Sequence, residues 1–136
     1  MSDDVALLDV RGLKTWFGSS EKPIRAVNGV SFRVPTGRMV ALVGESGCGK
    51  SVTALSLGRL VPEPPGYYPA GQILFDGEDV LTMSERQLHR LRGRGIGYVF
   101  QEPAASLNPV VRIGTQIMEG VRLHRRALDA RDEALR

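Results

Sequence analysis

The sequence has few of the features that mark secreted or membrane-spanning proteins. It contains a single cysteine, Cys48, so no intrachain disulfide can form, which is typical of proteins in a reducing compartment. No apolar run approaches the ~20 residues needed to cross a bilayer. The acidic start of the chain, residues 1–4, does not resemble a signal peptide. No internal repeat or low-complexity segment is evident. We therefore expect a cytoplasmic protein.

The charge of the chain is only weakly biased. Its 136 residues carry 18 Lys and Arg against 15 Asp and Glu, which gives a net charge of +3. The basic residues are spread along the sequence, and arginines around a nucleotide or an anionic membrane surface explain them equally well. We predict no nucleic-acid partner. The length is enough for one domain with its own core.

One stretch carries a specific chemical signal. Residues 44–51 read Gly-Glu-Ser-Gly-Cys-Gly-Lys-Ser, which fits the phosphate-binding P-loop pattern G-x-x-x-x-G-K-[ST]. An apolar run, residues 39–43, precedes the pattern, and a second run, residues 52–57, follows it. This order predicts a buried strand, a glycine turn and a helix, which is the context that a phosphate site requires.

The residue types in this loop suit an anionic ligand. Gly44, Gly47 and Gly49 allow backbone angles closed to larger residues and a close approach to phosphate. The backbone amides from about Gly47 onward can point into a concave nest at the start of the helix. Lys50 supplies a positive charge for the β- and γ-phosphates, and Ser51 supplies a hydroxyl oxygen suited to Mg²⁺.

The whole loop is predicted to contact the nucleotide. Its predicted contacts are Gly44, Glu45, Ser46, Gly47, Cys48, Gly49, Lys50, Ser51 and Val52. Val52 lacks the hydroxyl that many P-loops have at this position, so its backbone amide is the group that remains for phosphate. We expect a thiol reagent on Cys48 to block ATP binding and ATP to protect the thiol. The alternative is a small residue whose side chain points away.

The first half of the chain has mainly strand patterns. Residues 5–17 and 24–34 are predicted strands. Asn28 and Gly29 interrupt the second as either a hairpin turn or a simple connector. The proline-rich residues 61–71 predict a loop. A short strand over residues 72–75 then turns at Asp76 and Gly77.

The second half alternates helix and strand patterns. Ser84 and Gln87 fit a capping box that should open a helix running to about Arg92. Residues 96–100 predict a buried strand, which Pro103 ends. Residues 113–136 predict a helix. Its shared face would hold Ile113, Ile117, Val121, His124 and Leu128.

This succession of motifs resembles the ATP-binding subunit of ABC transporters. Phe100-Gln101-Glu102-Pro103 follows the P-loop region at the end of a predicted strand, and Gln101 matches the family's Q-loop glutamine. The run Ala-Ala-Ser-Leu-Asn-Pro over residues 104–109 is similar to importers of dipeptides, oligopeptides and glutathione. The resemblance covers about residues 5–126.

The resemblance implies an α/β fold. The P-loop NTPase core would hold parallel strands with helices, joined to an antiparallel β subdomain, and the nucleotide-binding domain would be incomplete. Residues 1–103 would form the β subdomain and P-loop core. Residues 104–136 would form the Q-loop and the truncated start of a helical subdomain.

The resemblance also implies roles for two residues outside the P-loop. Phe17 matches the aromatic ring that stacks on adenine, with Trp16 as the neighbouring candidate. The alternative is that both rings are core side chains of a strand. Gln101 would help to place Mg²⁺ and the attacking water. Lys50 and Gln101 are thus the implied catalytic residues, and Ser51 and Gln101 the implied metal ligands.

The implied function is the ATP-binding component of a peptide importer with ATP and Mg²⁺ as cofactors. Its partners would be transmembrane permease subunits, a second ATP-binding subunit in a homo- or heterodimer, and indirectly an extracytoplasmic solute-binding protein. The subunit would lie peripherally on the cytoplasmic face of the plasma (inner) membrane.

Three motifs of the family are absent from the 136 residues. These are the Leu-Ser-Gly-Gly-Gln signature, the apolar run followed by Asp-Glu, and the switch histidine. Asp76 follows an apolar run, but Gly77 stands where the catalytic Glu should be. We therefore expect weak ATP binding and negligible hydrolysis, and we leave open whether the chain is an enzyme. A binding-only fragment, another P-loop NTPase such as a kinase or GTPase, and a non-transport ABC protein remain alternatives.

Overall fold

The computed structural model describes residues 6–100 and 107–124. They fall into two compact units, one ending at His89 and the other beginning at Arg90. The first unit holds most of the regular structure and all of the P-loop. The main elements are β1 (Ala6–Phe17), β2 (Ile24–Pro35), α1 (Lys50–Ser56), β3 (Gly66–Phe75), β4 (Glu78–Asp79), α2 (Glu85–Arg90) and α3 (Ile113–His124).

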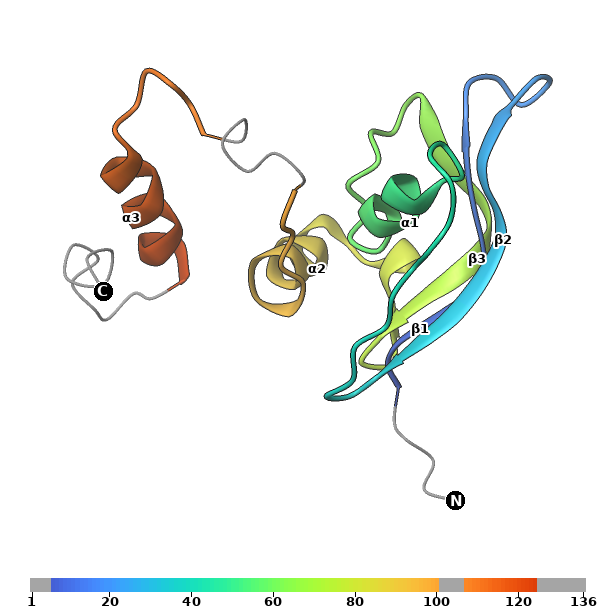
Figure 1. Ribbon diagram of the computed structural model, residues 1–136, viewed down its shortest axis with the longest axis horizontal. Helices are drawn as coiled ribbons and strands as arrows, with labels where there is room; N and C mark the ends of the chain where they lie inside the picture. The colour runs from blue at the N-terminus through green and yellow to red at the C-terminus, as the bar shows by residue number, and fades with distance from the viewer. Residues whose placement is uncertain (1–5, 101–106, 125–136) are drawn as a thin grey trace. The chain divides into compact units, whose positions relative to one another are not determined.

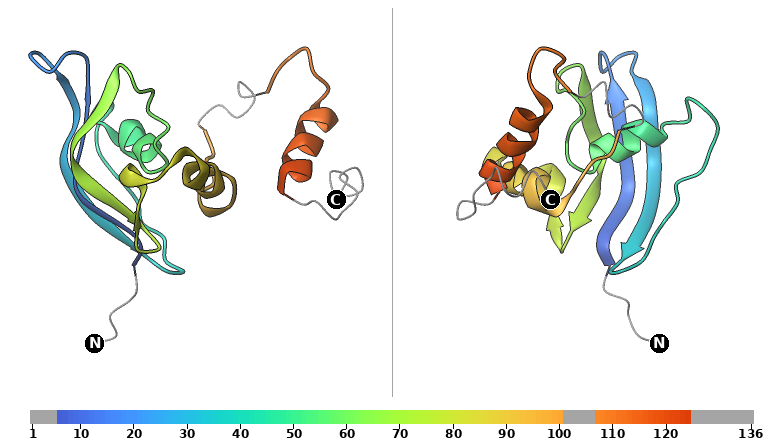
Figure 2. Two further views of the ribbon diagram at one scale, coloured as in Figure 1. Left: turned by 180° about the vertical axis from the view of Figure 1, so that it is seen from behind. Right: turned by 60° about the vertical axis from the view of Figure 1, so that its left-hand side comes forward.

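The first unit is built on an antiparallel sheet with the strand order β2-β1-β3-β4. On one face of this sheet β1 buries Leu8, Val10, Leu13 and Thr15, and the register shift between Val10 and Leu13 moves the buried phase from even to odd positions. That face carries α1, as two views of the curved sheet show (Figures 1 and 2). The buried apolar side chains of the unit are Leu8, Val10, Leu13, Val27, Val61, Ile73, Val80 and Leu88. The antiparallel subdomain predicted from the sequence is therefore formed.

A β-bulge replaces the hairpin considered at Asn28 and Gly29. Leu13 pairs with Val30 and Lys14 pairs with Asn28, so Gly29 is an extra residue in β2. Its φ of +89° lies in the left-handed region, which glycine adopts without strain. β2 continues past it because β1 supplies ladder partners on both sides of the bulge.

The predicted loop over residues 61–71 is wrong from Gly66 onward, where β3 begins. Phe17 pairs with Gly66 and Trp16 with Tyr67. Pro69 falls in an irregular stretch of the ladder, where its missing N–H is tolerated. The turn at Asp76 and Gly77 is confirmed. Both residues have positive φ, 48° and 82°, and they join β3 to β4 in a two-residue hairpin.

Residues 39–43 do not form the buried strand that their apolar run predicted. They run as an extended segment without ladder partners among the described residues, and Met39 and Val43 are 97% and 88% exposed. A buried strand needs neighbours on both sides to pair its backbone groups. The prediction failed because apolar periodicity does not supply those neighbours.

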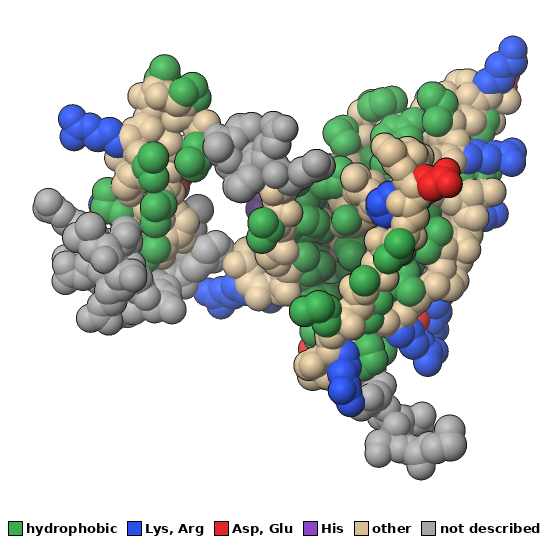
Figure 3. Space-filling model, in the orientation of Figure 1, with side chains coloured by type: hydrophobic (Ala, Val, Ile, Leu, Met, Phe, Trp, Pro, Cys, Tyr) green, Lys and Arg blue, Asp and Glu red, His purple; other side chains and the backbone are tan. Residues whose placement is uncertain are grey.

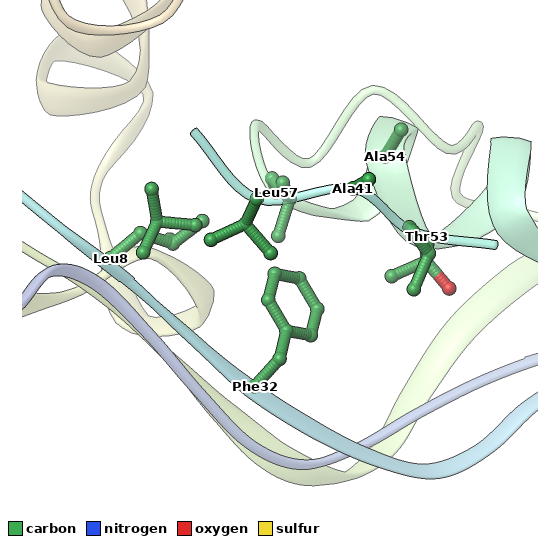
Figure 4. Close-up of a pocket in the computed structure, with 9 residues that line it drawn as sticks. Leu8, Phe32, Ala41, Thr53, Ala54 and Leu57 are labelled. Atoms are coloured by element: carbon green, nitrogen blue, oxygen red, sulfur yellow. The ribbon is translucent and has the colours of Figure 1, made fainter. Parts of the chain in front are cut away.

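The other side of this segment borders an apolar cavity of about 240 Å³. Phe32 points from β2 toward Leu57 and Ala41, and Leu8 lies at one end of the cavity (Figure 4). Figure 3 shows hydrophobic side chains gathered in this hollow of the first unit. Residues 40–42 of the segment thus line this cavity together with apolar residues of the sheet and α1.

The predicted capping at Ser84 is confirmed in part. The side-chain Oε1 of Gln87 accepts hydrogen bonds from the backbone N of Ser84 at 2.9 Å and from its hydroxyl at 2.7 Å. The helix α2 ends at Arg90, and a π-helical turn (Leu91–Gly95) follows. The helix therefore stops near the predicted residue, with a change of geometry in its last turn.

In the second unit, residues 96–100 do not form the predicted strand. Val99 is 94% exposed, and Phe100 stacks on Tyr98 with ring centroids 6.3 Å apart. None of the described residues pairs with this segment, so its apolar pattern again lacked a ladder neighbour.

The predicted C-terminal helix is confirmed over α3, while its continuation lies outside the described residues. The side-chain amide of Gln116 donates to the carbonyl oxygens of Asn108 and Val111 and so ties the helix to the turn before it. The boundary predicted between residues 103 and 104 also lies outside the described residues. Within the described part of the chain, no helix is both long and apolar enough to span a bilayer.

Candidate nucleotide-binding site

The P-loop leads from the extended segment into α1, which begins at Lys50. Gly47 and Gly49 have φ values of +81° and +93°, in the region that favours glycine. Gly44 does not have a left-handed φ, but a Cβ there would stand 2.6 Å from Cys48 Sγ. Gly47 and Gly49 are therefore favoured by their backbone conformation, while a Cβ at Gly44 would have to displace the Cys48 side chain.

Gly49 fixes the loop against the sheet. A Cβ at this position would collide with the carbonyl oxygen of Ala26 in β2. The carbonyl oxygen of Gly49 accepts hydrogen bonds from the backbone N of Thr53 at 2.8 Å and from its hydroxyl at 2.9 Å. The first turn of α1 is thus fixed on β2 by a contact that only glycine permits.

The loop closes around the ammonium group of Lys50. Nζ donates to the carbonyl oxygens of Gly44 at 2.7 Å and Glu45 at 2.6 Å, and it lies 3.6 Å from Cys48 Sγ. The charge that was predicted to meet phosphate therefore lies within the loop. A phosphate oxygen arriving there would exchange these neutral carbonyl bonds for a stronger bond between opposite charges.

The other predicted contacts lie around this centre with different exposure. Glu45, Ser46 and Ser51 are exposed, and Val52 is half-buried in α1. Ser51 lies in the first turn of α1 and is exposed, so its hydroxyl oxygen is open to solvent, and its predicted role as a Mg²⁺ ligand stays a prediction. Gln101 lies outside the described residues, so its predicted catalytic and metal-binding roles stay predictions.

Phe17 and Trp16 point to opposite faces of the sheet. The hydroxyl of Thr15 meets α1, and side chains alternate along a strand, so Phe17 lies on the α1 face and Trp16 on the other. The ring of Phe17 reaches to 3.3 Å from the point where a Cβ on Gly66 would stand. Of the two candidate adenine platforms, Phe17 is the one on the side of the P-loop.

The ring of Trp16 already has partners. The guanidinium carbon of Arg25 lies 4.9 Å from its centroid, and Tyr67 meets it edge-on at 6.2 Å. A cation over an indole face is a favourable arrangement. Trp16 is therefore a side chain that packs on the outer face of the sheet. The role of Phe17 in stacking on adenine stays a prediction.

The sequence analysis missed a buried pair of hydroxyl groups, Thr15 and Ser56, that links β1 to α1. Their oxygens lie 2.9 Å apart, and both residues are fully buried. The sequence signal for this pair is that each hydroxyl residue occupies a position where the strand or helix pattern predicts a buried apolar side chain. Neither pattern indicates that the two positions meet.

A charged cluster on the outer face of the sheet lies apart from the loop. Asp9 is almost buried and accepts two hydrogen bonds from the Arg11 side chain, at 2.7 and 3.0 Å, and Arg33 lies 3.3 Å away. The hydrogen bonds from Arg11 above all hold the pKa of Asp9 below its ordinary value, although burial opposes this shift. The Asp9–Arg33 contact joins β1 to β2 at a position where the two residues are ladder partners.

Residues 27–135 match the protein family described as ABC transporter. This span is well over half of the chain and includes the P-loop and α1. The chain belongs to the ABC transporter family.

Similar proteins include ATP-binding proteins named for peptide, oligopeptide and peptidoglycan transport. A Sinorhizobium fredii protein named as the probable peptide ABC transporter ATP-binding protein y4tR is 49% identical over 129 residues, 95% of this chain. The Bacillus subtilis oligopeptide transport ATP-binding protein OppD is 44% identical over 83% of the chain. An Agrobacterium fabrum peptidoglycan transport ATP-binding protein, YejF, is 51% identical over 87%.

The chain spans only part of these relatives, 38%, 32% and 22% of their lengths respectively. Among solved structures, an ATP-binding cassette dimer in a post-hydrolysis state, bound to ADP and Pi, matches with a TM-score of 0.78 at 23% identity. The match covers 94% of this chain and 54% of that one. The fold predicted from the sequence, an ABC nucleotide-binding domain in part, is therefore confirmed.

Proposed function

We propose that this chain binds ATP as part of the ATP-binding component of an ABC importer for peptides. The observation that supports it most directly is the position of Lys50, whose ammonium lies within the glycine loop and 2.7 Å from the carbonyl oxygen of Gly44. The names of its relatives favour peptides as the transported solute. The phosphates would take the loop of residues 44–51, and the base would stack on Phe17.

The residues of the loop fit both parts of a magnesium nucleotide. Lys50 would bind and orient the β- and γ-phosphates, and the amides at the start of α1 would donate to phosphate oxygens. Ser51 would hold Mg²⁺ through its hydroxyl oxygen. Bound Mg²⁺ would neutralise part of the phosphate charge.

The wider assembly follows from the family. The proposed partners are permease subunits in the membrane and a second ATP-binding subunit, with an extracytoplasmic solute-binding protein acting indirectly. The proposed location is the cytoplasmic face of the membrane. Within the 136 residues the signature segment and the Asp-Glu motif are absent, so we propose nucleotide binding without appreciable hydrolysis for this polypeptide.

Titration calorimetry with MgATP, together with a phosphate-release assay, tests the proposal. The purified protein should bind MgATP, and phosphate release should stay at the level of a Lys50→Met variant. A lack of MgATP binding would contradict nucleotide binding. A hydrolysis rate that depends on Lys50 would contradict the binding-only part of the proposal. Capture of the protein by permease-containing membranes, but not by membranes without permease, would support the transport role.

A further inference from the structure

Two buried hydroxyl groups connect the helix after the P-loop with the central strand of the sheet. Ser56 Oγ donates to the carbonyl oxygen of Val52 at 2.7 Å, which uses its single proton. Thr15 Oγ1, 2.9 Å from Ser56 Oγ, is therefore the donor to Ser56. Both residues have 0% exposure, so water does not compete for this bond.

Both ends of α1 meet one place on the sheet. Thr15 pairs with Val27 in the ladder of β1 and β2. At the start of α1, Gly49 touches Ala26, and the side chain of Val27 lies 3.7 Å from the point where a Cβ on Gly49 would stand. The helix thus contacts β2 through Gly49 and β1 through Ser56. These two contacts lie at the ladder pair formed by Thr15 and Val27.

The candidate base platform follows at once in the same strand. Phe17 is two residues beyond Thr15 and lies on the same face of β1. The phosphate loop and the ring of Phe17 are therefore joined by a short path through α1, Ser56 and Thr15. Each step of the path is a covalent connection or a buried contact.

We infer that Thr15 and Ser56 are positioning residues that set the separation between the phosphate site and the base-stacking ring of Phe17. The inference rests on the proposed binding of ATP to this site. Both hydroxyl residues are fully buried, so they would touch neither end of a bound nucleotide. Their loss should weaken only a ligand that contacts the phosphate loop and the ring of Phe17 together. ATP is such a ligand, whereas tripolyphosphate contacts the phosphate loop alone.

Thr15→Val tests this inference, because valine keeps the shape of the side chain and removes the donor, while Ser56 keeps its bond to Val52. The measurement is the affinity of the purified protein for MgATP and for magnesium tripolyphosphate. We expect Thr15→Val to weaken MgATP about fivefold, the size of one ordinary hydrogen bond, and to leave tripolyphosphate within a factor of about two. Thr15→Ser keeps the hydroxyl and should restore the wild-type ratio of affinities.

Two further variants separate positioning from stability. Ile73→Val removes a methylene from a fully buried side chain of β3 and should lower the melting temperature without changing the ratio. Ser56→Ala breaks the same link from the helix side, and the double variant with Thr15→Val should change the ratio no more than either single variant.

The possible results are distinct. Three results would overturn the inference and leave ATP binding intact. Thr15→Val and Ser56→Ala could weaken the binding of both ligands equally, or they could weaken neither. The third result is that Ile73→Val changes the ratio of the two affinities as much as they do. If the wild-type protein bound tripolyphosphate but not MgATP, or bound neither, both the proposed function and the inference would fail.

Discussion

Gly49 stands against Ala26 so closely that the carbonyl oxygen of Ala26 occupies the place of a Cβ on Gly49. The backbone at Gly49 also has a left-handed φ of +93°. This contact fixes the last residue before α1 to the antiparallel sheet. The phosphate loop is therefore held by the sheet at its helical end.

Gly49→Ala should be much more damaging than Gly47→Ala. Both positions have a positive φ, and both variants should lose about 1 kcal/mol from that strain. Nothing lies within 4 Å of a Cβ at Gly47, whereas a Cβ at Gly49 meets backbone that cannot swing aside. We expect Gly49→Ala to be less stable than Gly47→Ala by about 2 kcal/mol in urea unfolding. Equal stabilities would show that β2 and the loop separate easily.

Lys50→Met should remove most of the affinity for MgATP. The ammonium is the positive side chain within the loop that can meet phosphate, and a hydrogen bond to a charged group is worth about 1.5–3 kcal/mol. We expect a loss of affinity of about 10- to 100-fold in titration calorimetry. Lys22→Met, in the exposed loop after β1, removes the same charge and should bind as the wild type does. A similar loss in both variants would assign the effect to net charge alone.

Alkylation of Cys48 should block nucleotide binding. The thiol is exposed, lies 3.6 Å from the Lys50 ammonium, and is the only cysteine of the chain. A maleimide on it would fill the space beside the loop. We expect MgATP to slow the labelling and the labelled protein to lose MgATP binding, while Cys48→Ser is unaffected by the reagent. Normal binding by labelled protein would place the thiol outside the site.

The ion pair of Asp9 should make stability depend on acid pH. Because Arg11 lowers the pKa of Asp9 in the folded chain, the carboxylate stabilises the fold above the unfolded pKa of about 3.9. That contribution is lost as the pH falls through the lower folded pKa. Asp9→Asn should therefore lower the melting temperature at pH 7, and its effect should shrink as the pH falls through the lowered folded pKa. Asp76→Asn, in the exposed β3–β4 turn, is the matched control. A gap between wild type and Asp9→Asn that stayed constant with pH would contradict the ion pair.

The sequence predicted those parts of the fold that local chemistry determines. The P-loop pattern predicted a helix directly after the loop, and α1 begins at Lys50. The Asp76 and Gly77 pair predicted a tight turn, and Ser84 with Gln87 predicted a helix start. Each depends on residues a few positions apart. The strand pattern of residues 5–17 was confirmed as β1, although a register shift between Val10 and Leu13 moves the buried phase from even to odd positions.

The failures all depended on distant partners. Residues 39–43 and 96–100 have apolar runs typical of strands but no ladder neighbours among the described residues. β3 begins at Gly66 because β1 pairs with it, against the local preference of the prolines. Thr15 and Ser56 are 41 positions apart, so no local pattern could bring their hydroxyls together.

The strand order β2-β1-β3 constrains how the chain can fold. β1 and β2 are neighbours in sequence, so their ladder forms from local contacts. β3 must join the other edge of β1, and the connection from β2 to β3 contains the P-loop and α1. Such non-local pairing is slow compared with a hairpin. The connection that carries the P-loop and α1 is therefore closed between two strands only once β3 has paired with β1.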